Sequence, residues 1–246
     1  GSEMCIRDSF PTDDSIMSLA IAKAIIVSKP DFSDLSDNAV KCMQSIGRNY
    51  PDCGYGGRFY GWMFSDDPRP YNSYGNGSAM RVSAAGFVAR SLEEAKLLSK
   101  LVTEVTHNHP EGIKGAEATA VAIYMAKTGS GIFEIKDYIK ENYYPMNFTL
   151  DEIRDTYRFN ETCQDTIPQA LQAFFESSGF EDAIRNAISI GGDSDTLAAI
   201  CGSVAEAYYG IPDDIRKQAL TFLDKDLLKL LTLFESKYTP IVEKTH

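Results

Sequence analysis

Apolar side chains recur with the 3.6-residue period of an α-helix along nearly the whole chain, and no other feature constrains its fold as strongly. In the first such segment, 13–27, five of them share one face: Ile16, Leu19, Ala20, Ala24 and Val27. Lys29-Pro30 ends this segment, because the residue before a proline disfavours the helical conformation. The sequence lacks the strict alternation and hairpin turns that are typical of strands. It therefore predicts an all-α fold.

The stretches between the periodic segments carry residues that begin helices. Ser91 with Glu94, and Thr149 with Glu152, have the spacing at which a hydroxyl and a carboxylate satisfy each other's free backbone amides. Pro110 suits a first helical turn, as does Pro168, because the missing amide hydrogen would have no partner there. We expect helices at 13–27, 34–48, 79–90, 92–105, 110–127, 132–142, 168–176, 181–190, 194–209, 213–223 and 226–237.

One long segment, 51–77, lacks the helical period. It is rich in glycine, proline and asparagine, and it is far longer than a usual connection between helices. Its aromatic residues are Tyr55, Phe59, Tyr60, Trp62, Phe64, Tyr71 and Tyr74. Because disordered segments are poor in aromatic residues, we predict an ordered loop that packs against the rest of the protein.

Length and composition indicate one domain. Hydrophobic residues make up 43% of the 246 residues and charged residues 24%, which is ordinary for a folded protein. No change of composition marks a second domain. We predict that the domain covers 10–246, because Gly1-Ser2 resembles the remnant of a cleaved tag and 3–9 has no periodicity, as in a non-native leader.

Charge, hydropathy and cysteine content argue against several classes of protein. The net charge of −11 would repel a nucleic-acid backbone, so non-specific nucleic-acid binding is not expected. No apolar run is long enough to span a membrane, and no secretion leader is recognisable. The five cysteines are scattered without C-x-x-C spacing, which favours inert packing thiols in a reduced, cytoplasmic setting. A monomer is the expected state.

Two clusters of acidic and hydroxyl residues stand at predicted helix starts. Thr12, Asp13 and Asp14 precede the first helix, and the sequence GGDSDT at 191–196 leads into a helix rich in small residues. Helix capping is one explanation, because such side chains are preferred at N-termini, where they complement the helix dipole.

A metal site is the other explanation. Two adjacent acids at one helix start, and a D-x-D behind a glycine pair at another, exceed what single caps can use. Carboxylates with hydroxyls form an oxygen ligand set that favours Mg²⁺, Mn²⁺ or Ca²⁺ over zinc. Gly191-Gly192 would permit a tight turn through which Asp193 and Asp195 converge. If the two clusters meet in space, they could hold two cations, one to position a water and one to polarise a substrate.

The sequence GGDSDT followed by LAAICGSVAEAYYG closely resembles the C-terminal signature of the ADP-ribosylglycohydrolases, a family that includes the dinitrogenase reductase-activating glycohydrolases. Three further motifs match in the expected order: PTDDS at 11–15, GNGSAMR at 75–81 and THNHPEGIKGAEATA at 106–120. A lone D-x-D would be a weak signal, but four ordered motifs are specific. The resemblance implies a single-domain orthogonal helical bundle with a centre of two Mg²⁺ ions, or Mn²⁺, that cleaves the N- or O-glycosidic bond between ADP-ribose and an acceptor.

Carried over position by position, the resemblance implies two groups of site residues. The metal ligands would be Thr12, Asp13, Asp14, Asp193, Asp195 and Thr196. The residues that bind ADP-ribose, around its ribose and diphosphate, would be Asn76, Gly77, Ser78, Met80, His107 and Gly112. Free amides of a glycine-rich turn suit an anion, although GNGS is also typical of a plain turn. The aromatic residues of 51–77 could stack adenine, but we expect a hydrophobic cluster for most of them.

The sequence departs from the family pattern at its beginning. Members normally carry a glycine-rich helix with a Gly-Asp pair ahead of an F-T-D-D-T motif, whereas here the motif lies at Thr12 and has Ser15 in place of the commoner threonine. We therefore expect an N-terminally truncated family domain that lacks one acidic residue of the pocket. Weak metal binding or slow turnover would follow.

The leading hypothesis is a divalent-metal-dependent hydrolase that removes ADP-ribose from an acceptor. Asp14 or Asp193 would orient or deprotonate the attacking water, and the acidic cluster would stabilise positive charge that develops on the sugar. One alternative is a catalytically impaired module that only binds ADP-ribose. Another is a structural helical protein whose acidic clusters are caps. The motifs do not indicate the acceptor.

Overall fold

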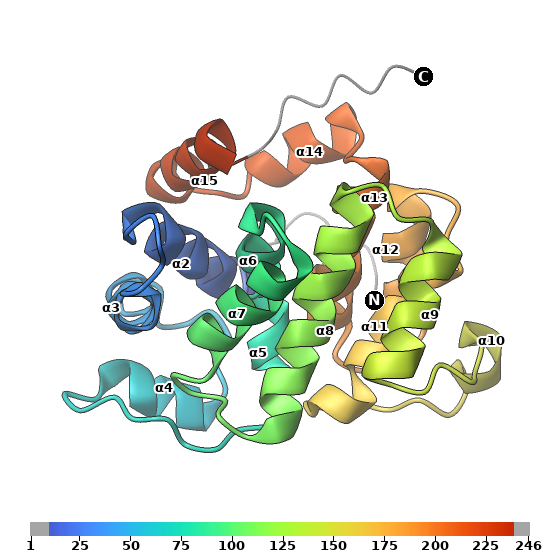
Figure 1. Ribbon diagram of the computed structural model, residues 1–246, viewed down its shortest axis with the longest axis horizontal. Coiled ribbons are helices and arrows are strands. Elements are labelled where there is room, and N and C mark those ends of the chain that lie inside the picture. The colour runs from blue at the N-terminus through green and yellow to red at the C-terminus, as the bar shows by residue number, and fades with distance from the viewer. Residues whose placement is uncertain (1–9, 239–246) are drawn as a thin grey trace.

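The structure is a computed structural model that describes residues 10–238, and it consists of helices packed around a central helix, α8 (Figure 1). The α-helices are α2 (Asp13–Val27), α3 (Leu35–Gly47), α4 (Gly57–Phe64), α5 (Gly77–Met80), α6 (Ser83–Val88), α7 (Leu92–Thr103), α8 (Pro110–Lys127), α9 (Ile132–Asn142), α10 (Leu150–Ile153), α11 (Ile167–Phe175), α12 (Phe180–Ser189), α13 (Ser194–Tyr209), α14 (Asp213–Leu220) and α15 (Lys225–Tyr238). A 3-10 turn, η1 (Cys163–Asp165), precedes α11.

The predicted all-α fold is confirmed. Between residues 10 and 238 no strand forms, and β pairing is limited to an isolated antiparallel bridge between Gly75 and Thr162. The expected tag remnant or leader at 1–9 and the last part of the predicted domain, 239–246, lie outside the described residues.

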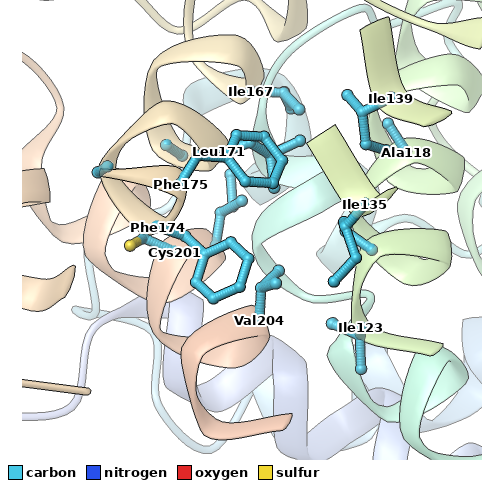
Figure 2. Close-up of a cluster of buried hydrophobic side chains, with 14 of the residues drawn as sticks. Ala118, Ile123, Ile135, Ile139, Ile167, Leu171, Phe174, Phe175, Cys201 and Val204 are labelled. Carbon is cyan, nitrogen blue, oxygen red and sulfur yellow. The ribbon is translucent and has the colours of Figure 1, made fainter. Parts of the chain in front are cut away.

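Helix α8 contributes to both hydrophobic clusters of the core. Ala118 and Ile123 belong to the first cluster, together with residues of α9, α11, α12 and α13. Figure 2 shows part of it, with Phe174 of α11 and Val204 of α13 across from the α8 and α9 side chains. Ala116 and Ala120 of α8 belong to the second cluster, with residues of α2, α3, α4, α6 and α7. Full burial of a large apolar side chain stabilises the fold by about 1.5–3 kcal/mol.

The expected capping pair is complete at Thr149 and half formed at Ser91, where the Glu94 carboxylate accepts from the Arg90 amide and not from the Ser91 amide. The Ser91 hydroxyl accepts a hydrogen bond from the Glu94 amide at 3.1 Å. Both halves of the capping box between Thr149 and Glu152 are present at the start of α10. Pro110 is the first residue of α8, and Pro168 lies in the first turn of α11.

The segment 51–77 is a loop only in part, because it contains α4, which the sequence did not predict. Phe59, Trp62 and Met63 have helical spacing and are buried in the second cluster, and the Phe59 and Trp62 rings stack at 5.4 Å. The glycines around these residues, Gly57 and Gly61, hide the short helical period in the sequence. Tertiary packing stabilises a helix that is too short to be stable alone.

Two other predictions were wrong in detail. The single helix expected at 79–90 is two short helices, α5 and α6, which are separated at Arg81 and Val82. Val27, placed on the buried face of α2, is 54% exposed. Helix α2 lies between α3, α6 and α15, so it buries residues on several sides, including Ile21 and Ile25.

Helices α2 and α13 hold the two acidic clusters at their N-termini. The start of α2 is fixed by the Asp13 amide, which donates a hydrogen bond to the Cys53 carbonyl at 2.8 Å. Helix α13 packs closely on α12, because a Cβ atom at Gly202 would lie 2.9 Å from Cδ1 of Ile184. Both helices contact α5, so the ends of α2 and α13 meet beside the GNGSAMR motif.

The described cysteines lie mostly in the core. Cys42, Cys163 and Cys201 are buried, Cys53 is partly buried, and all four are free thiols. Cys5 lies outside the described residues. Between residues 10 and 238, no helix has the length and apolar character needed to cross a membrane.

Candidate active site

The two acidic clusters face one pocket of about 450 Å³. The predicted site residues that line it are Asp13, Asp14, Asn76, Gly77, Met80, His107, Asp193, Asp195 and Thr196. They come from the starts of α2 and α13, from α5 and the residue before it, and from the loop after α7. The structure thus brings together residues that are far apart in the sequence.

In the first cluster, the side chains contact one another instead of capping α2. Thr12 occupies the N-cap position, but its side chain makes no capping hydrogen bond. Its hydroxyl donates to Oδ2 of Asp14 at 3.0 Å. Asp14 is only 5% exposed, and its Oδ1 is buried without a hydrogen-bond partner among the described residues. A carboxylate oxygen in that situation is costly unless a cation or proton joins it.

In the second cluster, the glycine pair adopts the left-handed backbone conformation that glycine permits. Gly191 and Gly192 both have positive φ, 73° and 71°. Asp193 is the N-cap of α13, and it too makes no side-chain capping bond. Its Oδ2 accepts a hydrogen bond of 2.7 Å from Nδ2 of Asn76. Side-chain capping therefore accounts for neither N-cap residue.

The carboxylates raise one another's pKa. Burial and the neighbouring charges of Asp14 and Asp195 raise the pKa of Asp13 to about 7. Burial and Asp195 also raise the pKa of Asp14, although the Thr12 and Thr196 hydroxyls oppose the shift. Burial raises the pKa of Asp193 to about 7, against the effect of the hydrogen bond from Asn76. These mutual effects show that the two clusters are close enough to repel each other.

His107 lies in the wall of the pocket beside a buried arginine. Its Nδ1 is 2.7 Å from the Thr106 hydroxyl, which also accepts a hydrogen bond of 2.6 Å from the guanidinium of Arg81. Burial, then the charges of Arg81 and Arg58, hold the pKa of His107 well below its usual value. The imidazole is therefore neutral near pH 7. His109, by contrast, accepts a hydrogen bond from the Glu111 amide and caps α8.

Three predicted site residues do not line the pocket. Thr12 lies behind Asp14, to which it donates its hydroxyl hydrogen bond. Ser78 is fully buried, and its hydroxyl lies within hydrogen-bond distance of the Gly75 and Gly112 carbonyls. Gly112 allows close packing, because a Cβ atom there would lie 2.6 Å from the Ser73 carbonyl oxygen.

The pocket is also lined by residues outside the predicted set of site residues, although two of them, Phe59 and Tyr71, belong to the aromatic residues considered for adenine stacking. These additional lining residues are Gly54, Gly56, Gly57, Arg58, Phe59, Tyr71, Ser73, Gly75, Arg81, Phe159 and Glu161. Arg81 belongs to the GNGSAMR motif, so the sequence indicated that it lies near the site. Its burial could not be predicted from the sequence. Phe159 and Glu161 are exposed at the pocket and belong to no motif. The backbone amide of Asn76 donates a hydrogen bond of 2.7 Å to the backbone carbonyl of Glu161, and this contact holds the segment that carries both residues at the pocket.

The acidic side chains of the described residues do not form a complete set of metal ligands. Within residues 10–238, no three histidine, cysteine, aspartate or glutamate side chains converge closely enough to hold an ion as they stand. The metal-ligand role of the two clusters stays a prediction.

Fold and pocket together define a class of protein, an all-α protein with an acidic pocket between two helix N-termini. A family model described as ADP-ribosylglycohydrolase matches residues 3–240. The chain belongs to the ADP-ribosylglycohydrolase family, as the four motifs indicated. Membership of this family places it among the hydrolases.

Known relatives are similar over different shares of their length. ADP-ribosylarginine hydrolase Tri1 of Pseudomonas putida is 29% identical over 158 residues, which cover 61% of this chain and 42% of that protein. ADP-ribosylhydrolase ARH3 of Homo sapiens is 24% identical over 280 residues, or 88% of this chain and 76% of that protein. The ADP-ribosyl-(dinitrogen reductase) glycohydrolase of Rhodospirillum rubrum is 26% identical over 228 residues, or 87% and 73%. The match thus spans less than half of the Pseudomonas protein.

A solved structure confirms the fold. The chain of an ADP-ribosylglycohydrolase-related protein complex aligns with a TM-score of 0.63 at 23% sequence identity, covering 92% of this chain and 81% of that chain. At this identity the likeness establishes the arrangement of helices only.

Proposed function

We propose that this protein hydrolyses the glycosidic bond between ADP-ribose and an acceptor, and that the reaction depends on divalent cations. The observation that carries the proposal is the meeting of the α2 and α13 N-termini in one pocket, with Asp13, Asp14, Asp193 and Asp195 lining it. The names of the three relatives reported above, each a hydrolase of ADP-ribosyl groups, agree with this activity.

The residues of the pocket suit a hard cation. Oδ1 of Asp14 is buried without a partner among the described residues, and burial, together with neighbouring carboxylates, raises the pKa values of Asp13 and Asp193. The ligands would be the six residues expected from the motifs: Thr12, Asp13, Asp14, Asp193, Asp195 and Thr196. A bound Mg²⁺ or Mn²⁺ pair would supply positive charge that offsets the carboxylates and polarises substrate oxygens.

Side chains of the protein would activate the water and stabilise the charge that develops on the sugar. Asp14 or Asp193 would orient the attacking water and accept its proton as a general base. Asn76 holds Asp193 in place through its 2.7 Å hydrogen bond. The negative charge of the cluster would stabilise the sugar as the leaving group departs and positive charge develops on it.

The test is release of ADP-ribose, detected by mass spectrometry, from a panel with arginine, serine, acetyl and nucleobase linkages. Each substrate is incubated with Mg²⁺, with Mn²⁺ and with a chelator. Release that the chelator abolishes supports the proposal, and the linkage that is cleaved identifies the acceptor. Binding of ADP-ribose by calorimetry without release from any substrate would support a binding module instead.

A further inference from the structure

Arg81 is a buried cation with no carboxylate partner. It is 1% exposed, and no ion pair between residues 10 and 238 includes it. Its guanidinium carbon lies 5.3 Å from the ring centre of Phe59, and its Nε has no hydrogen-bond partner. Burial lowers the pKa of Arg81 to about 10, so it still carries its charge at neutral pH. A buried charge without an ionic partner destabilises the fold, which indicates that Arg81 has a specific role in the site.

The hydrogen bonds of Arg81 lead to His107 through Thr106. The guanidinium can only donate, so the Thr106 oxygen accepts its hydrogen bond of 2.6 Å. The single hydroxyl proton of Thr106 then has two possible acceptors: Nδ1 of His107 at 2.7 Å and the Thr103 carbonyl at 3.4 Å. The shorter contact favours donation to Nδ1.

A second contact also disfavours a proton on Nδ1. The same Arg81 nitrogen lies 3.5 Å from Nδ1, so a protonated Nδ1 would face the positive charge of the guanidinium. Both contacts therefore favour the neutral ring that carries its proton on the other nitrogen, Nε2. Nε2 lies 3.6 Å from the positions that Cβ atoms would occupy at Gly75 and at Gly77. Both glycines line the pocket.

We propose that Arg81 is a positioning residue that acts through Thr106 to hold His107 as a neutral imidazole with its proton on Nε2. The ring then presents one N–H donor to the pocket between Gly75 and Gly77. The other charged and titratable groups near the ring are Arg58 and Tyr71, whose ring centre lies 5.9 Å from that of His107. The value of this donor for catalysis rests on the proposed function, in which a phosphate oxygen of ADP-ribose would accept the hydrogen bond.

The first experiment measures the proton directly, without substrate. The chain has three histidines, so ¹⁵N-labelled full-length protein gives a spectrum that His109→Gln and His246→Gln variants can assign. We expect His107 to show a protonated Nε2 and an unprotonated Nδ1, unchanged between about pH 5.5 and 8.5. A proton on Nδ1, or an ordinary titration, would overturn the proposal.

Two matched variants distinguish the effect of the Arg81 charge from that of the hydrogen-bond relay, which runs from Arg81 through the Thr106 hydroxyl to His107. Thr106→Val keeps the Arg81 charge and the side-chain shape but removes the donor to Nδ1, so the signals of both tautomers should appear. Arg81→Gln keeps an N–H donor but removes the charge, so protonation of His107 should begin at a higher pH than in the wild type. Arg81→Lys should restore the wild-type pH behaviour. Unchanged His107 signals in both Thr106→Val and Arg81→Gln would refute the relay.

Binding and kinetics distinguish positioning from mere support of the fold. In Thr106→Val the dissociation constant of ADP-ribose and KM should rise about tenfold, with kcat nearly unchanged, because the hydrogen bond is formed in ground and transition states alike. A purely structural role would lower the melting temperature and leave the affinity of the folded fraction intact, which would contradict the proposal. If wild-type protein fails to bind ADP-ribose, the proposed function fails, while the substrate-free spectra still decide the role of Arg81.

Discussion

The side-chain amide of Asn76 donates a hydrogen bond of 2.7 Å to the carboxylate of Asp193, across 117 positions of the sequence. This contact joins the glycine-rich turn before α5 to the acidic start of α13. It orients one carboxylate oxygen of Asp193 and opposes the rise in its pKa that burial causes. The conformation of the glycine-rich turn therefore affects the position and the pKa of a carboxylate in the acidic cluster.

Replacing Asn76 with alanine should impair ADP-ribose release. Asp193 would lose its neutral donor, its pKa would rise further, and the carboxylate would lose its orientation. We expect kcat to fall by about tenfold or more, because a hydrogen bond to a charged group is worth about 1.5–3 kcal/mol. Steady-state kinetics under saturating Mg²⁺ measure the effect. Asn142→Ala, on the exposed end of α9, is the control and should behave like wild type.

Replacing Asp13 with asparagine should stabilise the metal-free protein and abolish its activity. Burial and two neighbouring carboxylates raise the pKa of Asp13 to about 7, so its ionised form destabilises the fold above that pH. The neutral amide removes this repulsion, and the melting temperature at pH 8 should rise by several degrees, as about 1 kcal/mol would produce. A lower melting temperature would show that the carboxylate contributes packing or hydrogen bonds instead.

Magnesium should stabilise the protein more at high pH than at low pH. The pKa values of Asp13 and Asp193 are both raised to about 7, so protons and cations compete for these groups below that pH. Without metal, stability should fall as pH rises from about 4 to 7, because the native state then holds protons that the unfolded state has lost. Thermal unfolding with Mg²⁺ and with a chelator, at pH values on both sides of 7, measures both effects. An equal increase at every pH would argue against ligation by these carboxylates.

Glu206 gives a second pH effect, away from the pocket. Burial on α13 and the charge of Glu235 on α15 raise its pKa to about 7, while Arg216 on α14 opposes the shift. Because the folded-state pKa lies above the unfolded value, the ionised group destabilises the fold as pH rises through about 4.5 to 7. Under saturating Mg²⁺, Glu206→Gln should match wild type near pH 5 and melt at a higher temperature near pH 8. Equal melting temperatures at both pH values would contradict the shift.

Gly86 should be intolerant of a side chain. A Cβ atom there would lie 2.8 Å from the Ala120 carbonyl oxygen and 2.8 Å from Cβ of Ile123, where α6 meets α8. Gly86→Ala should therefore destabilise the protein by about 1–3 kcal/mol, because overpacking shifts the backbone. Chemical denaturation measures the loss. Gly61→Ala on α4 is the matched control, since no atom lies within 4 Å of that Cβ position, and it should be neutral or slightly stabilising.

The sequence by itself determined most helices and the placing of the two acidic clusters at helix N-termini. Capping contacts such as Ser91 with Glu94 join residues three positions apart, so they can be recognised without the fold. Gly191-Gly192 is also a local feature, because glycine is the residue type that adopts their positive φ angles without steric cost. The family was evident for a related reason, because its motifs are continuous in the sequence.

Only the tertiary structure decided which of these local features meet. The pairing of Asn76 with Asp193, the burial of Arg81 and the arrival of Phe159 at the pocket depend on how distant helices pack. Packing also made a helix of α4 and split the segment 79–90, against the local pattern. Short-range hydrogen bonds set helix ends, whereas the pocket forms from contacts that exist only once the two hydrophobic clusters around α8 are complete.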